Sequence, residues 1–273
     1  MLAHTIGLIG AGRMATALAR GLVRAKLVEP TSLVASDPSA AARAAFAGDV
    51  PGARVVDDNA DVASHADVVL LAVKPQQMTD VLSDIRGVIR GDTLVVSIAA
   101  GVTLARLAAG LPPGQRIVRV MPNTPCLIGR GASAYSRGRH ATADDGRLVA
   151  QLLFAVGVAY EVPEDQLDAV TGLSGSGPAF VYTMIEQLRE GGVRVGLPAE
   201  LAADLAVRTV AGAAEMVLAS GESPALLRDH VTSPGGTTLA GLQALEEAGF
   251  HAAVIAAVEA ATRRSAELGT SPS

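Results

Sequence analysis

The alternation of short β-rich runs with helical patterns over residues 5–163 constrains the fold of this chain most. Such alternation predicts a parallel sheet covered by helices on both faces. Residues 68–73 are continuously apolar, as expected of a central strand. We predict strands over residues 6–9, 33–36, 54–56, 68–73, 94–99, 117–121, 132–135 and 158–162. Helices are predicted over residues 14–24, 78–85, 104–109 and 144–155, the last opened by a capping box of Thr142 and Asp145.

The β signal stops after Pro163, and long helical patterns follow. We predict helices over residues 178–190, 198–220, 237–247 and 251–268. The expected organisation is therefore a sheet domain over residues 1–163 and a helical domain over residues 164–273.

The predicted helix at residues 198–220 is apolar around most of its circumference. Its polar residues form one narrow stripe of Glu200, Asp204, Arg208 and Glu215. A helix of this kind must be buried on most sides, and a small helical domain offers too few partners for that. We infer a close dimer through the helical domain; the alternative is one buried central helix in a monomer.

Composition argues against several classes of protein. A net charge of -5 and the lack of a dense Lys or Arg run argue against a nucleic-acid partner. Cys126 is the only cysteine, which excludes an intramolecular disulfide and a zinc knuckle and fits a reducing cytoplasm. No apolar run approaches the roughly 20 residues of a membrane span, and the histidines show no metal-ligand spacing. We therefore expect neither a membrane partner nor a metal site.

Residues 5–15 predict a strand, a glycine turn and the start of a helix. Gly10 permits the sharp turn, Gly12 lets the backbone approach a pyrophosphate, and Ala15 allows the helix to pack closely on the strand. The turn indicates a dinucleotide site, the alternative being a purely structural turn. The predicted fold class is α/β, with an N-terminal Rossmann-type doubly wound sheet and a C-terminal all-α dimerisation domain.

The second strand ends at Ser36 and Asp37, where a dinucleotide fold distinguishes a ribose 2′-hydroxyl from a 2′-phosphate. Asp37 would accept a hydrogen bond from the hydroxyl and repel the phosphate. Ser36, Arg13 and Arg43 could instead support the phosphate. NADP(H) is slightly favoured, and NAD(H) stays open.

Residues 231–238, Val-Thr-Ser-Pro-Gly-Gly-Thr-Thr, lie just before a helical pattern. The adjacent Gly235 and Gly236 let consecutive N–H groups point at one spot, where the helix dipole adds positive potential. Hydroxyls of Ser233, Thr237 and Thr238 could bind the rest of a small polar ligand. The loop therefore predicts an anion site, or more simply a helix N-cap after a Pro-Gly turn.

Three further segments fall where the predicted sheet would present loops: Ala-Val-Lys-Pro at residues 72–75, Met-Pro-Asn-Thr-Pro at residues 121–125 and Leu-Ser-Gly-Ser-Gly-Pro-Ala at residues 173–179. Leu-Arg-Asp at residues 227–229 precedes the 231–238 loop. In these motifs, their order and their spacing, the chain resembles the pyrroline-5-carboxylate reductases over almost its whole length.

The resemblance implies hydride transfer from NADPH or NADH to the C=N carbon of 1-pyrroline-5-carboxylate, which gives L-proline in the last step of proline biosynthesis. It implies dimers that often assemble further. It also implies that the substrate lies between the nucleotide domain of one subunit and the Ser-Pro-Gly-Gly loop of its partner.

The resemblance also implies residue roles. Thr238 matches the position that contacts the imine nitrogen, and we assign it the catalytic role of polarising that nitrogen or relaying a proton to it. The predicted substrate-binding residues are Ser174, Ser176, Gly177, Ser233, Gly235, Gly236, Thr237 and Thr238. The predicted cofactor-binding residues are Gly10, Gly12, Arg13, Met14, Ser36, Asp37, Ala72, Val73, Lys74, Pro75 and Asn123.

Structural alternatives stay open for several of these residues. Thr238, Ser174 and Ser176 would also serve as helix caps, Lys74 as half of an ion pair and Asn123 as a loop brace. Cys126 is interpreted as a packed small hydrophobe rather than a nucleophile. Arg13 stands where the family commonly has Asn, and Ala15 where it commonly has Gly, so the phosphate contacts could differ in detail.

Two other functions stay open. A related imine or β-hydroxyacid reductase of the same plan would be separated by a panel of substrates. A dinucleotide-sensing regulatory protein without chemistry is disfavoured because the chain keeps Thr237, Thr238 and both glycines of the loop.

Overall fold

The computed structural model describes residues 2–270, which divide into two compact units. The first unit runs to Ser176 and resumes at Ala260, and the second is Gly177–Glu259. The division falls later in the chain than residue 163, and the last turns of the final helix count with the first unit. The domain boundary at residue 163 stays a prediction.

The first unit is built on one eight-stranded sheet of order β3-β2-β1-β4-β5-β6-β7-β8. Each predicted strand forms, with ends within two residues of the expected ones. The order from β3 to β6 is that of dinucleotide-binding folds, whose ligands lie where the strand order reverses. The strands are β1 (Ile6–Ile9), β2 (Leu33–Ser36), β3 (Arg54–Val56), β4 (Val68–Leu71), β5 (Leu94–Ser97), β6 (Arg116–Met121), β7 (Gly131–Arg137) and β8 (Gly157–Glu161).

The expectation of an all-parallel sheet is wrong at one pair, because β6 and β7 are antiparallel. The connection between them holds only the short 3-10 helix η3 (Thr124–Ile128). A parallel crossover needs about a dozen residues or more, usually with a helix, and this connection is too short for one. The pair β7 and β8, which α6 (Ala143–Phe154) connects, is parallel again.

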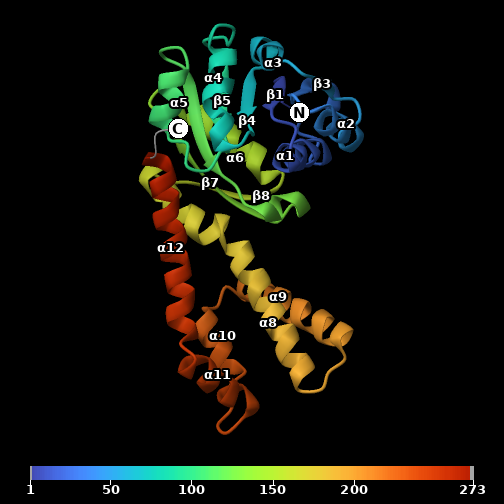
Figure 1. The fold of residues 1–273 in the computed structure, drawn as a ribbon, viewed down its shortest axis with the longest axis vertical. Coiled ribbons are helices and arrows are strands. Elements are labelled where there is room, and N and C mark those ends of the chain that lie inside the picture. Colours follow the sequence, from blue (N-terminus) through green and yellow to red (C-terminus); the bar gives the residue numbers. More distant parts are fainter. Residues whose placement is uncertain (1, 271–273) are drawn as a thin grey trace. The chain divides into compact units, whose positions relative to one another are not determined.

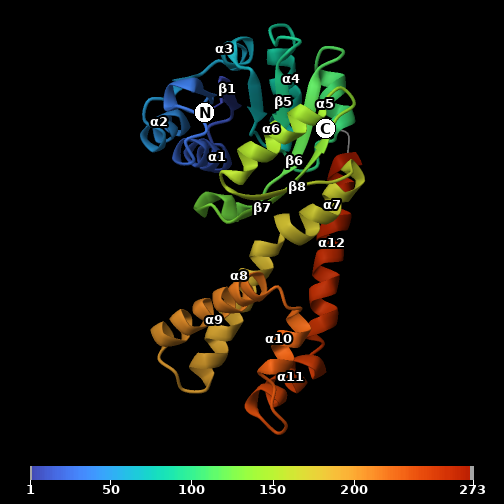
Figure 2. The same ribbon diagram turned by 180° about the vertical axis from the view of Figure 1, so that it is seen from behind.

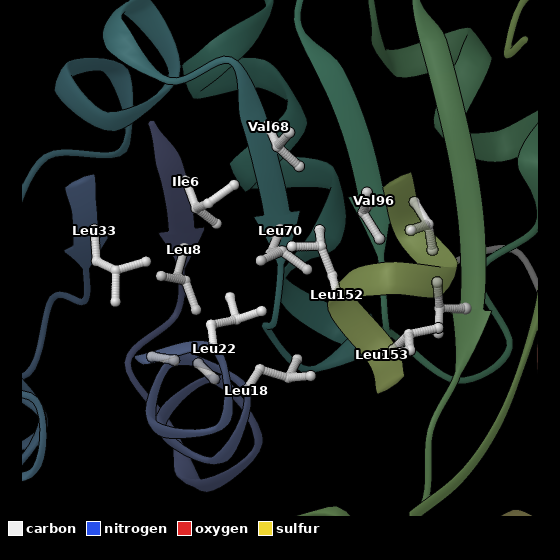
Figure 3. Packing of buried hydrophobic residues seen from close by; sticks show 14 of the residues in the cluster. Ile6, Leu8, Leu18, Leu22, Leu33, Val68, Leu70, Val96, Leu152 and Leu153 are labelled. Carbon is white, nitrogen blue, oxygen red and sulfur yellow. The ribbon is translucent and has the colours of Figure 1, made fainter. Parts of the chain in front are cut away.

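Helices cover both faces of the sheet (Figures 1 and 2). Residues of α1 (Arg13–Arg24), α2 (Ala40–Asp49) and α6 share one buried cluster with the strands. Residues of α3 (Asn59–His65), α4 (Met78–Arg86) and α5 (Leu104–Gly110) share the other. In Figure 3, Leu18 and Leu22 of α1 lie against Leu8 of β1 and Leu70 of β4. Because β1, β2 and β4 are parallel, their carboxyl ends lie at the same edge of the sheet, between the two apolar layers.

The four helices predicted for this region are confirmed, and so is the capping box. The Thr142 side chain accepts from the Asp145 N–H at 3.1 Å, and the Asp145 carboxylate accepts from the Thr142 N–H at 2.8 Å. These bonds satisfy two N–H groups at the start of α6.

The second unit is helical. The four predicted helices are present, and one further short helix, α10, was not predicted. Within residues 2–270 no helix is both long and apolar enough to span a membrane. The helices are α8 (Gly177–Arg194), α9 (Ala199–Ser220), α10 (Pro224–His230), α11 (Thr237–Glu247) and the first part of α12 (Phe250–Thr270), which ends in the first unit.

Helix α9 is largely exposed in the single chain. It packs on α8, which lies beside it in both views (Figures 1 and 2), and only Ala202 and Ala206 of α9 are buried. Leu205, Met216 and Leu218 are exposed to 46%, 55% and 81%. The alternative of a central helix buried within a monomer is therefore wrong, because one chain leaves this apolar surface uncovered.

A buried arginine ties the carboxyl-terminal turns of α12 to the sheet. Arg119 of β6 is 5% exposed and pairs with Glu164 at 3.2 Å and Asp168 at 3.6 Å. The Glu164 carboxylate also accepts the Leu104 N–H at 2.7 Å, and the Asp168 carboxylate accepts the Ser265 hydroxyl at 2.7 Å. One guanidinium thus joins the sheet, the start of α5 and the last helix.

We expect Arg119→Met to lower the free energy of unfolding by about 3 kcal/mol, because it leaves two partly buried carboxylates without their cation. Urea denaturation followed by circular dichroism measures the change. Arg20→Met is the matched control, since its pair with Asp49 is exposed and should contribute under about 1 kcal/mol. Equal losses in the two variants would contradict a special role for the buried network.

Candidate active site

Gly10 forms the turn between β1 and α1, at the point where the strand order reverses. Its φ is +96°, and a Cβ at this position would lie 2.7 Å from the Ala72 carbonyl oxygen after β4. The Gly10 N–H donates to the Ser36 carbonyl at 2.8 Å, and the Ala72 N–H donates to the Ile9 carbonyl at 2.8 Å. The fold itself therefore requires glycine here.

Gly12 differs, because no atom lies within 4 Å of a Cβ built on it. It is the N-cap of α1 with extended backbone, and no side chain caps the helix. The N–H groups of the first turn, including those of Arg13 and Met14, are thus left for a ligand. An open glycine before an uncapped helix start fits the pyrophosphate of a dinucleotide.

Asp37 lies just after β2 and braces the glycine turn. One carboxylate oxygen accepts the Ala11 N–H at 3.0 Å, and the other accepts the Ser39 N–H at 2.9 Å. Each carboxylate oxygen keeps a further lone pair, so Asp37 can still accept from a ribose hydroxyl.

Of the groups expected to support a 2′-phosphate, Ser36 is committed elsewhere and Arg43 only in part. The Ser36 hydroxyl is fully buried and donates to the Asn59 side chain at 2.8 Å. The Arg43 Nη1 group donates to the carbonyls of Asp37 and Pro38 at 2.8 and 3.0 Å, which leaves the donors on Nε and Nη2 for other partners. Arg13 lines a separate hollow of about 380 Å³ beside α1.

A pocket of about 300 Å³ opens beside Gly10 at the carboxyl ends of the strands. Four carboxylates line it, and no lysine or arginine stands among its lining residues. Sequence reasoning missed all but three of these residues, although those directly after β3 could have been found by their place at a strand end. The lining residues are Gly10, Asp37, Pro38, Asp57, Asn59, Val73, Gln77, Asp80, Val81 and Asp84.

The Ala72–Pro75 segment leaves β4 at the same edge. Val73 lines the pocket, and Pro75 opens the 3-10 helix η2 (Pro75–Gln77) with Lys74 as its N-cap. Lys74 is exposed, and among the described residues its ammonium group makes no ion pair. The structure therefore contradicts the ion-pair alternative for Lys74. A role of Lys74 in attracting an anionic cofactor or substrate stays a prediction.

Asn123 and Ser174 form a brace within the first unit. The Asn123 side-chain NH₂ donates to the carbonyl and the hydroxyl of Ser174, both at 3.2 Å, and its carbonyl accepts the Ala132 N–H at 2.9 Å. The Ser174 hydroxyl donates to the Ala132 carbonyl at 2.9 Å. The structure thus shows the loop-bracing role of Asn123, and ligand contacts by either side chain stay predictions. Ser176 ends this unit, and Gly177 starts α8.

The 231–238 loop leads into the start of α11 and leaves it without a side-chain cap. Gly235 has a φ of +70°, and a Cβ on Gly236 would lie 2.4 Å from the Ser233 hydroxyl, although this clash involves a movable side chain. Gly236 is the N-cap of α11, and no side chain caps that helix. The N–H groups of Thr237 and Thr238 at its start therefore face outward without a partner from the helix.

Thr238 does not act as a helix cap. It is half-buried, and its hydroxyl has no hydrogen-bond partner within the described part of the chain. The nearby Thr232 hydroxyl, by contrast, donates to the Arg228 carbonyl at 2.7 Å. The capping alternative for Thr238 is thus wrong, and its hydroxyl is available to a ligand.

Cys126 is 2% exposed within the cluster that packs α1 and α6 on the sheet. Burial raises the pKa of its thiol. Its interpretation as a packed hydrophobe is confirmed, because a nucleophile needs a lowered pKa.

Comparisons with known proteins agree with this geometry. Residues 164–268 match the family described as pyrroline-5-carboxylate reductase dimerisation, and residues 5–101 match the family described as NADP oxidoreductase coenzyme F420-dependent. The pyrroline-5-carboxylate reductase of Glycine max is 46% identical over 97% of this chain and 96% of its own length. That of Methanosarcina acetivorans is 45% identical over 97% of both chains.

Solved structures give the same result. The Coxiella burnetii pyrroline-5-carboxylate reductase superposes with a TM-score of 0.91 at 36% identity, covering 99% of this chain and 100% of that one. The Plasmodium falciparum pyrroline carboxylate reductase with NADP bound gives 0.89 at 34% identity, with the same coverage.

Proposed function

The chain belongs to the pyrroline-5-carboxylate reductase family, and we propose from this that it reduces the C=N bond of 1-pyrroline-5-carboxylate with NAD(P)H to give L-proline. The observation that carries the proposal is the uncapped start of α11 with the unpaired Thr238 hydroxyl. Free N–H groups at a helix start can bind a carboxylate, and a free hydroxyl beside them can donate to an imine nitrogen. This arrangement suits a substrate in which a carboxylate lies next to an imine nitrogen.

NAD(P)H supplies the hydride, with NADP(H) favoured and NAD(H) as the alternative. A relative of this chain carries NADP, and residues 5–101 match a family of NADP oxidoreductases. We assign Gly12 and the N–H groups of Arg13 and Met14 to the pyrophosphate. Asp37 faces the adenosine ribose in this assignment.

The 231–238 loop holds the substrate in this proposal. The N–H groups of Thr237 and Thr238 bind the carboxylate and fix the ring, whereas the Gly236 N–H already donates to the Ser233 carbonyl at 3.0 Å. The Thr238 hydroxyl donates to the imine nitrogen, where negative charge would otherwise build as hydride adds to the neighbouring carbon. Hydride forms the C–H bond, the nitrogen gains a proton, and the product is a secondary amine.

The enzyme self-associates through its dimerisation domain. We propose that the assembly is a homodimer or a larger oligomer built on the exposed side of α9. An apolar groove of about 480 Å³ between α8, α11 and α12 in the second unit offers further apolar surface for association. The absence of nucleic-acid and membrane partners and the cytoplasmic location stay predictions.

We expect Leu218→Glu to weaken the dimer, because Leu218 is 81% exposed in the single chain and a charge there would be buried on association. Size-exclusion chromatography with light scattering should show monomers at concentrations where the parent protein is dimeric. Glu215→Lys, on the polar stripe of the same helix, is the control. An unchanged mass for Leu218→Glu would contradict the placement of the interface.

The proposed activity is tested by oxidation of NADPH and NADH with 1-pyrroline-5-carboxylate, beside a panel of other cyclic imines and β-hydroxyacids. The proposal expects turnover that is fastest with 1-pyrroline-5-carboxylate. No turnover with either cofactor, or a clear preference for another substrate class, would overturn it.

A further inference from the structure

A polar hollow of about 460 Å³ lies where β7 and β8 end, and we call it the strand-end hollow. Both strands run antiparallel to β6, so their ends lie at the edge of the sheet opposite to the one that holds Gly10. The strand-end hollow is therefore separate from the proposed nucleotide site. Its lining residues are Ser136, Arg137, Gly138, Arg139, Ala141, Glu161, Val162 and Pro163.

Ser136 brings a buried hydroxyl without a partner to the wall of this hollow. The residue is 5% exposed, and its side chain makes no hydrogen bond within residues 2–270. Among those residues, the side-chain atoms that are both enclosed and unpaired belong to His4 and Gln115. The Ser136 hydroxyl is not one of them, so it is unpaired but open to the hollow. A buried hydroxyl in this state costs free energy unless something in the hollow bonds to it.

Two arginines bring charged donors to the same hollow. Arg137 pairs through Nε with the Glu161 carboxylate at 2.5 Å, which orients the guanidinium and leaves the donors on Nη1 and Nη2 unused by the described residues. Arg139 forms no ion pair and no side-chain hydrogen bond in the part of the chain that the structure describes. The nearby Arg119 is neutralised by its own buried acids. Two guanidinium groups against one carboxylate leave the lining net positive.

The backbone around the hollow is held by hydrogen bonds. The Gly138 N–H donates to the Ile117 carbonyl at 2.8 Å, and the Ala141 N–H donates to the Gly138 carbonyl at 3.0 Å. The Val162 N–H donates to the Tyr135 carbonyl at 2.9 Å and so joins the end of β8 to β7. Walls that are formed in advance lower the entropy that a ligand has to overcome when it binds.

We propose that the strand-end hollow binds a phosphate group, either as the free ion or as the phosphomonoester of a small molecule. Guanidinium groups and a hydroxyl are all donors, and a phosphate has enough oxygens to accept from each of them. The volume lies within the range of small-molecule sites, which leaves room for an organic part beside the phosphate. The inference goes beyond the proposed function and does not depend on it, because no residue of this lining has a role in the proposed reaction.

Calorimetric titration of the NADPH-saturated protein with inorganic phosphate and with ribose 5-phosphate tests the proposal. Saturation with NADPH keeps the probes from the start of α1. In Arg139→Gln the Kd for both probes should rise about tenfold, because a hydrogen bond to a charged group is lost. Arg137→Gln should raise the Kd at least as far. Arg147→Gln, which removes an arginine of α6 outside the lining, is the charge-matched control and should leave the Kd unchanged.

Ser136→Ala removes only the unpaired hydroxyl and should raise the Kd for inorganic phosphate about fivefold. Arg139→Gln breaks no bond among the described residues, so it keeps the test valid if Arg137→Gln disturbs the strand ends. A lower Kd for ribose 5-phosphate than for inorganic phosphate would assign the hollow to a phosphomonoester, and equal values would assign it to free phosphate. No detectable binding to the parent protein would overturn the proposal. Equal Kd values in the parent and both arginine variants would overturn it as well, because the phosphate would then be bound elsewhere.

Discussion

Thr238→Val is expected to reduce kcat with 1-pyrroline-5-carboxylate by about 100-fold or more, the usual effect of removing one donor aimed at developing charge. Valine keeps the shape of threonine and removes only the hydroxyl. The Thr238 hydroxyl bonds nothing in the described part of the chain, so its loss should leave the fold intact. Initial rates of NADPH oxidation at saturating substrate measure the effect.

Thr232→Val is the matched control for this experiment. It makes the same change in the same loop, but the Thr232 hydroxyl is already bonded to the Arg228 carbonyl. Its kcat should stay within about twofold to threefold of the parent rate. If Thr238→Val raised only KM, the hydroxyl would bind substrate and transition state equally, and the polarising role would be refuted.

Most of the sheet could be predicted from sequence because strands such as β1, β4 and β5 are short, mainly apolar runs followed by helical patterns. Residues 68–71 illustrate this, since four consecutive large apolar residues are buried between the two helix layers. The direction of β7 could not be predicted. The direction of β7 depends on the preceding connection, which is short and contains only a 3-10 helix. The hydrophobic periodicity of a strand does not indicate whether the strand runs parallel or antiparallel to its neighbour.

The candidate site was predictable where glycine or a helix start determines the geometry. Gly10 has a positive φ, and the 231–238 loop leaves α11 uncapped, both as the residue types indicate. Asn123 illustrates what sequence leaves open, because an amide in a loop after a strand serves equally as a brace or a ligand contact. Only its hydrogen bonds to Ser174 and Ala132 show that the fold already uses it.

The two glycines of the nucleotide turn should separate folding from cofactor binding. Gly12→Val places its side chain in open space on extended backbone, so the free energy of unfolding should change by less than about 1 kcal/mol. The same side chain would fill the approach to the start of α1, where the pyrophosphate is expected. Affinity for NADPH and NADH should both fall by about 100-fold or more, as measured by calorimetry.

Gly10→Ala, in contrast, should lower the free energy of unfolding. Its φ of +96° is strained for alanine, and the new Cβ would meet the Ala72 carbonyl oxygen, which belongs to backbone that cannot turn away. We expect a loss of about 2 kcal/mol or more in urea denaturation. A Gly12→Val protein that folds normally and still binds both nucleotides tightly would contradict the placement of the pyrophosphate. A Gly12→Val protein as destabilised as Gly10→Ala would show that both glycines serve the fold, because only an open position tolerates a branched side chain.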